Sequence, residues 1–358
     1  MLSERSSMKS YIEIDKRLIG PCKPVYIVAE MSANHGQNFE QAVRILEAAK
    51  NAGADAVKLQ TFMPGTITID CGKDYFQIKG TLWDGRALFD LYGEAYMPWE
   101  WQPKLKAVAD DLGIALFSSA FDPTAVDFLE GMGVPAHKVA SFEIVDIPLI
   151  RKMASTGKPL IISTGMATLS EVEEAVQAAR DAGATQIALL KCTSAYPAPP
   201  EEMNLRTIPH LAETFHVPVG LSDHTLGIAV PVTGVALGAC IVEKHFTLSR
   251  DIPGPDSAFS LEPGEFKTMV EAIRTAEKAL GRVNYEATEK ELNSRIFRRS
   301  LFVVKDVKAN DEFTEENVRS IRPGIGLSPR FLPNVLGRRA SRDIARGTPL
   351  SWADLASS

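Results

Sequence analysis

The chain has 358 residues, of which 45% are hydrophobic and 23% charged, as is usual for a globular protein with a large core. Its net charge of −6 argues against a nucleic-acid partner, because such a partner calls for a basic surface. The four cysteines, Cys22, Cys71, Cys192 and Cys240, lack CxxC spacing, so we expect a reducing compartment and no disulfide framework. The sequence suggests neither a signal peptide nor a membrane span, and we expect a cytoplasmic protein with no membrane partner.

Short apolar runs alternate with longer amphipathic segments from about residue 25 to residue 285. This alternation predicts parallel strands joined by crossover helices, and eight such units fit a closed (β/α)8 TIM barrel of the α/β class. An open doubly wound sheet is the alternative, although no G-x-G-x-x-G motif follows the first run. The predicted strands are VYIVAE (25–30), DAVKLQ (55–60), GIALFSSA (113–120), HKVAS (137–141), PLIIST (159–164), QIALLKCT (186–193), VPVGLSD (217–223) and ACIVEKH (239–245).

Two regions depart from this alternation. Residues 62–98, between the second and third predicted strands, form a long insert rich in aromatic and charged residues, which we expect to shape substrate binding. The barrel domain is predicted to span residues 1–285, followed by a polar linker at 286–296 and a small C-terminal domain at 297–358. Because so small a domain has a limited core, we expect it to dock on its own barrel or on a partner subunit.

Polar side chains follow the apolar run of every predicted strand. A strand inside a barrel should be apolar, so charges at the same end of each strand are expected to face a polar cavity. Any single one could be a solvated loop residue, but the recurrence on all eight strands disfavours that interpretation for the set. The set includes Glu30, Asn34, Lys58, Gln60, Lys138, Ser141, Glu143, Ser163, Ser194, Tyr196, Ser222, His224 and His245.

Two histidines, His224 and His245, close the last two predicted strands. Paired imidazoles at strand ends suggest a divalent metal with coordination positions open to substrate, although each could also be a structural histidine. Glu30 and Glu143 could complete the metal shell, act as a general base, or simply pair with lysines. These alternatives stay open at the level of the residues.

Two lysines, Lys58 and Lys138, lie on the second and fourth predicted strands, and serines follow the fourth, fifth and seventh. Lysine supplies a point charge, whereas hydroxyls and loop N–H groups supply directional donors. This combination suggests a site for phosphate and carboxylate groups.

A series of strings, in order and over nearly the whole chain, resembles the sialic acid synthase family. The C-terminal string FRRSLFVVKDVKANDEFTEENVRSIRPGIGLSP resembles the antifreeze-like (SAF) domain of that family, and the insert string IKGTLWDGRALFDLYGEAYMPWEW resembles its pseudaminic acid synthase branch. The strings of the barrel are EMSANH (30–35), AVKLQTF (56–62), FSSAFD (117–122), KVASFE (138–143), STGMAT (163–168), LLKCTSAYPAP (189–199), GLSDHT (220–225), VEKHFT (242–247) and GPDSAFSLEP (254–263).

The resemblance implies a transferase that condenses phosphoenolpyruvate with a sugar aldehyde, giving a nine-carbon 2-keto acid and phosphate with the help of Mn2+, Mg2+ or Co2+. In the pseudaminic branch the acceptor is 2,4-diacetamido-2,4,6-trideoxy-β-L-altrose. An N-acetylneuraminate or legionaminate synthase, which runs the same reaction on a different sugar, is the alternative.

The resemblance also assigns roles to individual positions. His224 and His245 match the metal ligands and, with Glu30 and Glu143, the catalytic set. We expect Asn34, Gln60, Tyr196 and Arg322 to contact the sugar, with Arg322 reaching into the site of the partner subunit in a domain-swapped homodimer. Ser194 stands where the neuraminate enzymes usually carry Asn and would replace that contact only in part. The phosphoenolpyruvate positions are Lys58, Lys138, Ser141, Ser163, Ser194 and Ser222.

Two other classes of protein fit parts of the pattern. A class II-type metal aldolase could use the same barrel with pyruvate and without a phosphate donor. A non-catalytic binding protein could use the C-terminal domain as its recognition module, but buried charge is costly unless it is used, and the charged strand ends therefore disfavour it.

Overall fold

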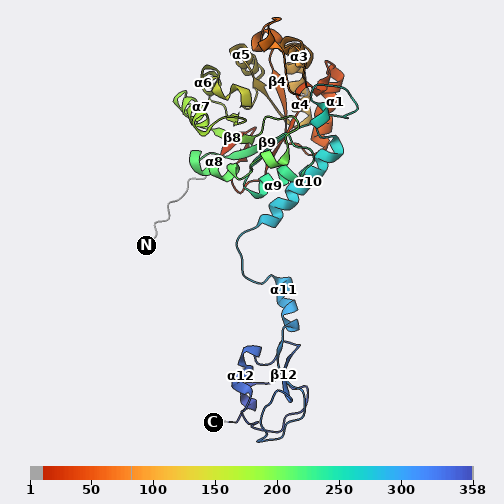
Figure 1. The fold of residues 1–358 in the computed structure, drawn as a ribbon, viewed down its shortest axis with the longest axis vertical. Coiled ribbons are helices and arrows are strands. Elements are labelled where there is room, and N and C mark those ends of the chain that lie inside the picture. The colour runs from red at the N-terminus through yellow and green to blue at the C-terminus, as the bar shows by residue number, and fades with distance from the viewer. Residues whose placement is uncertain (1–10, 82, 357–358) are drawn as a thin grey trace. The chain divides into compact units, whose positions relative to one another are not determined.

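The computed structural model describes residues 11–81 and 83–356, and the chain divides into two units, Met1–Gly281 and Arg282–Ser358. Eight parallel strands close into a barrel in the first unit (Figure 1). The strands follow the order β10–β3–β4–β5–β6–β7–β8–β9 around the barrel. The predicted TIM barrel is therefore confirmed, and the open doubly wound sheet is excluded. The strands are β3 (Tyr26–Glu30), β4 (Ala56–Thr61), β5 (Ala115–Ala120), β6 (His137–Val139), β7 (Leu160–Ser163), β8 (Ile187–Cys192), β9 (Val219–Asp223) and β10 (Ile241–His245).

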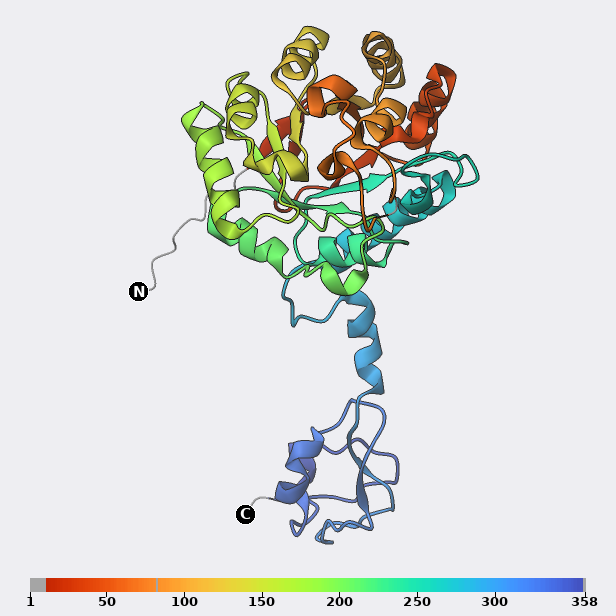
Figure 2. The same cartoon turned by 45° about the horizontal axis from the view of Figure 1, so that its top comes forward.

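Helices surround the strands on the outside of the barrel, as Figures 1 and 2 show. Their buried residues recur at helical spacing; in α1, for example, Ala42, Ile45, Leu46 and Ala49 face the strands. Among the described residues, no helix has the length and hydropathy needed to cross a membrane. The helices are α1 (Phe39–Asn51), α4 (Gln102–Leu112), α5 (Pro123–Met132), α6 (Ile147–Ala154), α7 (Leu169–Asp181), α8 (Thr207–Phe215), α9 (Ala229–Ala236) and α10 (Pro263–Leu280).

A short antiparallel hairpin, which the sequence analysis did not anticipate, precedes the barrel. It pairs β1 (Ile12–Ile14) with β2 (Arg17–Ile19). Both turn residues between them have positive φ, as two-residue hairpin turns of type I′ require. Ile12, Ile14 and Ile19 are almost fully buried and share a core cluster with residues that begin the barrel strands. The hairpin thus covers the amino-terminal end of the barrel.

The long insert after β4 is ordered around two helices, α2 (Pro64–Ile67) and α3 (Leu88–Ala95), and a 3-10 turn, η2 (Asp74–Phe76). A β-bridge between Gln77 and Ala87 draws its middle part into a loop. Because the insert leaves the barrel at the carboxyl end of β4, it lies at the end where α/β barrels place their chemistry.

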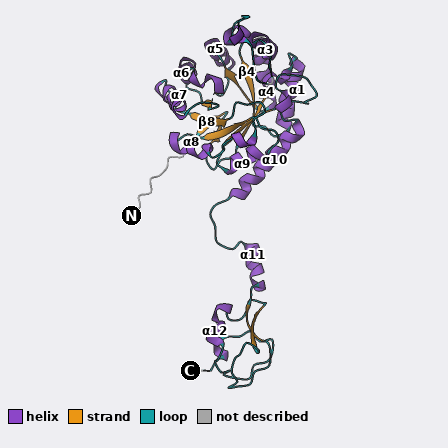
Figure 3. Ribbon diagram, in the orientation of Figure 1, coloured by secondary structure: helices purple, strands orange, loops and turns teal. Residues whose placement is uncertain are grey.

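The C-terminal unit is mostly loops around one small sheet, as the colouring of Figure 3 shows. Strands β11 (Ser300–Val303) and β12 (Val318–Ile321) pair antiparallel, and helix α12 (Leu332–Val335) follows. The sequence predicts only a linker at residues 286–296, whereas the structure forms helix α11 (Glu289–Ser294) there. Thr288 and Glu291 begin this helix with a reciprocal capping box, which explains why so polar a segment is helical.

Candidate active site

The carboxyl ends of three neighbouring strands bring a buried charge cluster together. Register places Glu30 of β3 beside Lys58 of β4 on one side and beside His245 of β10 on the other. The Lys58 Nζ atom lies 2.7 Å from Glu30 Oε2, as a charge contact without hydrogen-bond geometry, and 3.6 Å from Glu243 Oε1. It also donates to Ser119 Oγ at 3.1 Å. The polar cluster expected at the strand ends thus has a lysine at its centre.

Burial and neighbouring charges shift the pKa values in this cluster. Burial, reinforced by the charge of Glu243, raises the pKa of Glu30 to about 7 even though Lys58 opposes the shift. Burial alone would lower the pKa of Lys58, but Glu243 and Glu30 outweigh it and raise that pKa. Lys58 therefore stays charged.

A second buried lysine, Lys138 of β6, has no such partner. Its amine donates to Ser163 Oγ at 2.7 Å and to the Val139 carbonyl at 3.0 Å, and within the described residues no carboxylate forms an ion pair with it. Burial lowers the pKa of Lys138, with the charge of Glu243 acting against that shift. An anion brought to this amine would supply the charge that the protein does not.

Beside Lys138, a glycine leaves a cradle between two serines. A Cβ atom on Gly165 would lie 2.4 Å from Ser141 Cβ and 2.8 Å from Ser194 Oγ, so no other residue fits there without displacement. Cys192 lies below the cradle, and its sulfur accepts from Ser141 Oγ at 3.3 Å. Hydroxyl donors and an open backbone next to a buried amine are suited to a phosphate or carboxylate group.

The two histidines predicted as metal ligands face each other at the ends of β9 and β10. Their ring centroids are 5.4 Å apart. Nδ1 of His224 lies 2.9 Å from the Thr193 carbonyl, which can only accept, so Nδ1 carries a proton, and in the neutral ring Nε2 keeps its lone pair. Burial alone would lower the pKa of His224, but Cys192 and the Thr193 carbonyl outweigh it and raise that pKa. Nδ1 of His245 is buried without a partner among the described residues, and burial holds the pKa of His245 well below its usual value. Two imidazoles with available nitrogens fit a divalent metal.

The remaining ligands of such a metal are not evident from the protein. No group of three or more His, Cys, Asp or Glu side chains within residues 11–81 and 83–356 is arranged to hold a metal ion. A site with two protein ligands would leave the other positions to water and substrate oxygen.

Two further carboxylates, Glu243 and Asp256, belong to the cavity, although sequence reasoning gave neither a role. Glu243 accepts from Ser222 Oγ at 3.2 Å, and Asp256 is hydrogen bonded to Ser32, which also accepts from Gln60. Glu243 lies two residues before His245 on one strand, so strand periodicity could have identified it. Asp256 lies in a loop, where no periodicity exists.

Glu143, the second predicted carboxylate, follows β6 in a 3-10 turn, η4 (Ser141–Val145). Its Oε2 atom is buried without a hydrogen-bond partner among the described residues, and burial raises its pKa to about 7. Glu30, by contrast, contacts Lys58 and accepts from Gln60 Nε2 at 2.9 Å. Of the two carboxylates, Glu143 is the freer to take up a proton.

The predicted sugar-binding residues are placed differently from one another. Gln60 lies in the cavity, and Tyr196 packs on His224 with ring centroids 4.4 Å apart. The Asn34 amide donates to the Phe246 carbonyl and to Ser260 Oγ, so its nitrogen is used within the protein. Arg322 is exposed in the C-terminal unit.

Behind the cavity, a buried ion pair joins the same two strands that carry the imidazoles. Lys244 Nζ lies 2.5 Å from Asp223 Oδ2 and also donates to the Thr225 carbonyl. Asp223 and Lys244 are register partners and precede His224 and His245, so alternation points them away from the imidazoles. The pair fastens the strand ends from outside.

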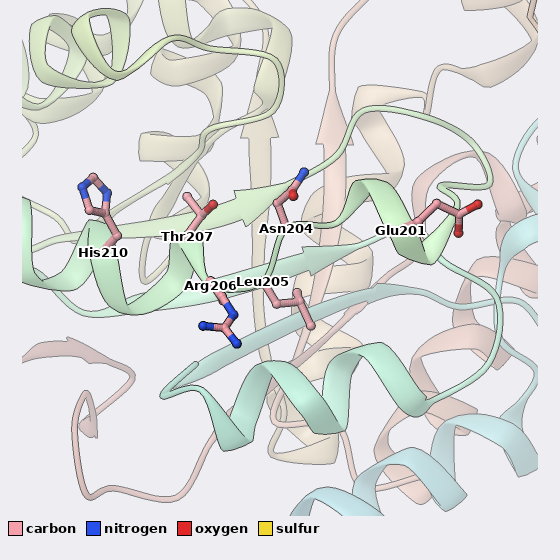
Figure 4. Close-up of a pocket in the computed structure, with 6 residues that line it drawn as sticks. All are labelled: Glu201, Asn204, Leu205, Arg206, Thr207 and His210. Atoms are coloured by element: carbon pink, nitrogen blue, oxygen red, sulfur yellow. The ribbon is translucent and has the colours of Figure 1, made fainter.

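A surface depression of about 530 Å³ lies elsewhere, at the start of α8 (Figure 4). None of the residues at the strand ends contributes to it, so it is separate from the candidate site. It is lined by Glu201, Asn204, Leu205, Arg206, Thr207 and His210.

A closed parallel barrel with cations, carboxylates and imidazoles gathered at its strand ends defines a barrel enzyme of the kind that acts on anionic substrates. The chain belongs to the NeuB family, whose model matches residues 45–285, and an SAF domain follows at residues 298–356. It is 46% identical to the pseudaminic acid synthase of Campylobacter jejuni over 93% of this chain and 97% of the relative. It is 37% identical to the N,N'-diacetyllegionaminic acid synthase of Legionella pneumophila over 93% and 95%.

A solved structure supports the same family membership. The crystal structure of N-acetylneuraminic acid (sialic acid) synthetase from Leptospira borgpetersenii, in complex with citrate, matches with a TM-score of 0.72 and 31% identity, covering 80% of this chain and 95% of that one. The predicted family membership is confirmed.

Proposed function

We propose that the protein is a pseudaminic acid synthase, which condenses phosphoenolpyruvate with 2,4-diacetamido-2,4,6-trideoxy-β-L-altrose and water to give pseudaminic acid and phosphate. The observation that carries the proposal is the buried Lys138 amine, which has a serine and a carbonyl but no carboxylate as partners and stands beside the Gly165 cradle. The likeness to the Campylobacter enzyme, at 46% identity, supports the choice of sugar.

In the proposed reaction, C3 of phosphoenolpyruvate attacks the aldehyde carbon of the open-chain sugar, whose oxygen takes up a proton from water and becomes a hydroxyl. Positive charge develops at C2, where a water adds and gives its proton to Glu143. The tetrahedral intermediate then expels phosphate by cleavage of the C2–O bond, and its C2 hydroxyl loses its proton to the departing phosphate and becomes the carbonyl of the 2-keto acid. Lys58 and Lys138 hold the phosphate and carboxylate throughout and offset the negative charge on the leaving group.

We further propose that His224 and His245 hold a divalent metal, Mn2+, Mg2+ or Co2+. When bound, such an ion polarises the aldehyde carbonyl of the acceptor. Thr193 fixes the tautomer of His224 and burial keeps His245 neutral, so each ring has a nitrogen that can act as a ligand. His224→Ala and His245→Ala should each weaken Mn2+ binding in calorimetric titration, and unchanged binding would refute the metal role.

We propose that the protein is a domain-swapped homodimer in which Arg322 reaches the cavity of the partner. The charges of the two units support their association: residues 1–281 carry 25 basic and 35 acidic residues, a net charge of −10, whereas residues 282–358 carry 14 and 10, a net charge of +4. Co-expression of Arg322→Ala with Lys138→Met should restore activity that neither variant has alone, because one site of each mixed dimer is then intact. Failure of the mixed dimer to recover activity would contradict the swap.

The decisive test incubates the purified full chain with phosphoenolpyruvate, Mn2+ and a panel of 2,4-diacetamido and N-acetyl hexoses. We expect phosphate release and a nine-carbon keto acid with the diacetamido trideoxy sugar. Preference for N-acetylmannosamine would overturn the choice of acceptor, and turnover of pyruvate without phosphate would indicate an aldolase. In 18O-labelled water the label should enter the keto acid; label in phosphate would refute cleavage of the C2–O bond.

A further inference from the structure

The insert after β4 sends one aromatic side chain to the loops that follow β8 and β10. The Trp83 indole Nε1 donates to the Pro255 carbonyl at 3.1 Å, in the loop that follows β10. The Trp83 ring also packs on Tyr196, in the loop that follows β8, with centroids 5.8 Å apart. Three loops that are far apart in the sequence therefore meet at Trp83.

Trp83, Tyr196 and Phe259 form a continuous aromatic wall beside the two imidazoles. Phe259, which is 1% exposed, has its ring centroid 5.2 Å from Tyr196 and 4.9 Å from His245. Tyr196 also reaches both imidazoles, with centroid distances of 4.4 Å to His224 and 6.3 Å to His245. The wall thus begins next to the imidazoles, at Phe259 and Tyr196, and ends at Trp83, which is partly exposed.

In contrast to the apolar wall, a polar chain of hydrogen bonds joins four side chains, those of Glu30, Gln60, Ser32 and Asp256. Asp256 immediately follows Pro255, the residue that holds Trp83. One short loop therefore contributes both to this polar chain and to the fixing of the aromatic wall. A ligand bound at the imidazoles would therefore have both hydrogen-bonding groups and ring carbons within reach.

The single polar atom of Trp83 is already used. Because its indole N–H donates to Pro255, the side chain has only ring carbons to offer a ligand. A methyl group gains by contact with such a surface, whereas a hydroxyl group there loses its hydrogen bonds to water.

We propose that Trp83 is a specificity-determining residue. It packs against the end of the acceptor sugar remote from the aldehyde and selects sugars whose C6 is a methyl group over those whose C6 carries a hydroxyl. This inference rests on the proposed condensation, since the imidazoles locate the aldehyde and the wall then locates the far end of the sugar. An apolar pocket discriminates against an added hydroxyl by about 100-fold at most, so the expected preference is about 10- to 100-fold in kcat/KM.

The test compares two acceptors, a 2,4-diacetamido-2,4,6-trideoxyhexose and the same sugar with a 6-hydroxyl, in the full-length enzyme and its variants. In Trp83→Ala the ratio of the two kcat/KM values should fall toward one, mainly by loss on the 6-deoxy sugar, while KM for phosphoenolpyruvate is unchanged. Trp83→Phe, which keeps a ring in the wall, should retain part of the preference. Tyr75→Ala is the matched control, because Tyr75 lies in the same insert, is 72% exposed and packs on Phe76.

The outcomes separate this inference from the proposed function. If the wild-type enzyme releases phosphate with neither sugar, the proposed condensation fails. If the wild type turns over the 6-deoxy sugar but both Trp83 variants keep the wild-type ratio, the specificity role of Trp83 is refuted.

Discussion

Two groups of buried polar residues lie at the strand ends, one behind β9 and β10 and one on the inner side, contributed by β6, the turn after it and β10. Behind the strands, Lys244 and Asp223 satisfy each other and Thr225. Inside, Lys138 has no ion-pair partner among the described residues, and buried atoms of Glu143 and His245 have no hydrogen-bond partner there. Buried polar groups are normally paired, so the incomplete group is the one arranged for a ligand.

The largest expected effect comes from breaking the complete pair. Lys244→Met should lower the free energy of unfolding by about 3–5 kcal/mol, because it leaves the Asp223 carboxylate buried without its cation. The double variant Lys244→Met with Asp223→Leu should recover much of this loss, since an apolar pair needs no desolvation of charge. Denaturant unfolding measures both, and a single variant as stable as wild type would show that the pair contributes nothing.

Removal of Lys138, the buried cation without an ion-pair partner, should reduce activity much more than stability. Lys138→Met is expected to lower kcat/KM for phosphoenolpyruvate by about 10²–10³-fold, because a preorganised charge at the phosphate is lost. Thermal stability should stay level or rise, since burial disfavours the charged amine in the folded protein. Lys152→Met, which removes an amine paired with Asp127 on the outer surface, is the control. A marked loss of stability in Lys138→Met would contradict the distinction between the two groups.

Filling the cradle should affect binding more than folding. Gly165→Ala places a Cβ atom 2.4 Å from Ser141 Cβ, and displacement of the serines should cost on the order of 100-fold in kcat/KM for phosphoenolpyruvate. Gly183→Ala is a matched control, because Gly183 also has positive φ but no atom within 4 Å of the added Cβ. Equal effects of the two substitutions on KM would mean that backbone strain, and not the cradle, is responsible.

The smallest effect concerns the proton on Glu143. Since its pKa is raised to about 7, kcat/KM should rise with pH through about 7 as the carboxylate becomes available as a base. Stability should move the other way, because a raised folded-state pKa stabilises below the unfolded value and that stabilisation is lost as pH rises through about 7. Glu143→Gln should remove the rising limb of kcat/KM and weaken the pH dependence of stability, of which the raised pKa of Glu30 leaves a part, whereas the exposed Glu174→Gln should change neither. A rising limb retained in Glu143→Gln would assign the base to another group.

The barrel could be predicted from sequence because its strands and helices carry distinct hydrophobic periods, and because repeated polar strand ends imply a shared cavity. The hairpin β1–β2 escaped prediction because its turn, Asp15-Lys16, lacks the Asn-Gly or Gly pattern that marks such turns. Helix α11 escaped because a capping box acts locally, within a segment whose overall polarity indicates a linker.

For the candidate site, strand order could predict which residues gather but not how their hydrogen bonds are shared. From the sequence, Glu30 and Glu143 are equally good candidates for the general base. Only the contacts of Glu30 with Lys58 and Gln60 distinguish the two. Asn34 likewise carries a suitable amide, yet its nitrogen is taken by Phe246 and Ser260. Such competition for partners arises from three-dimensional packing, which local patterns do not encode.

The hairpin at the amino-terminal end of the barrel also affects where substrates can enter and products can leave. Ile12, Ile14 and Ile19 pack against the first residues of the strands, so among the described residues the hairpin covers that end of the barrel, and substrates are expected to enter at the carboxyl ends of the strands. Phosphate and the keto acid must then depart by the route through which both substrates arrived. Two substrates that share one entrance are expected to bind, and their products to leave, in a fixed order, which product-inhibition kinetics would reveal.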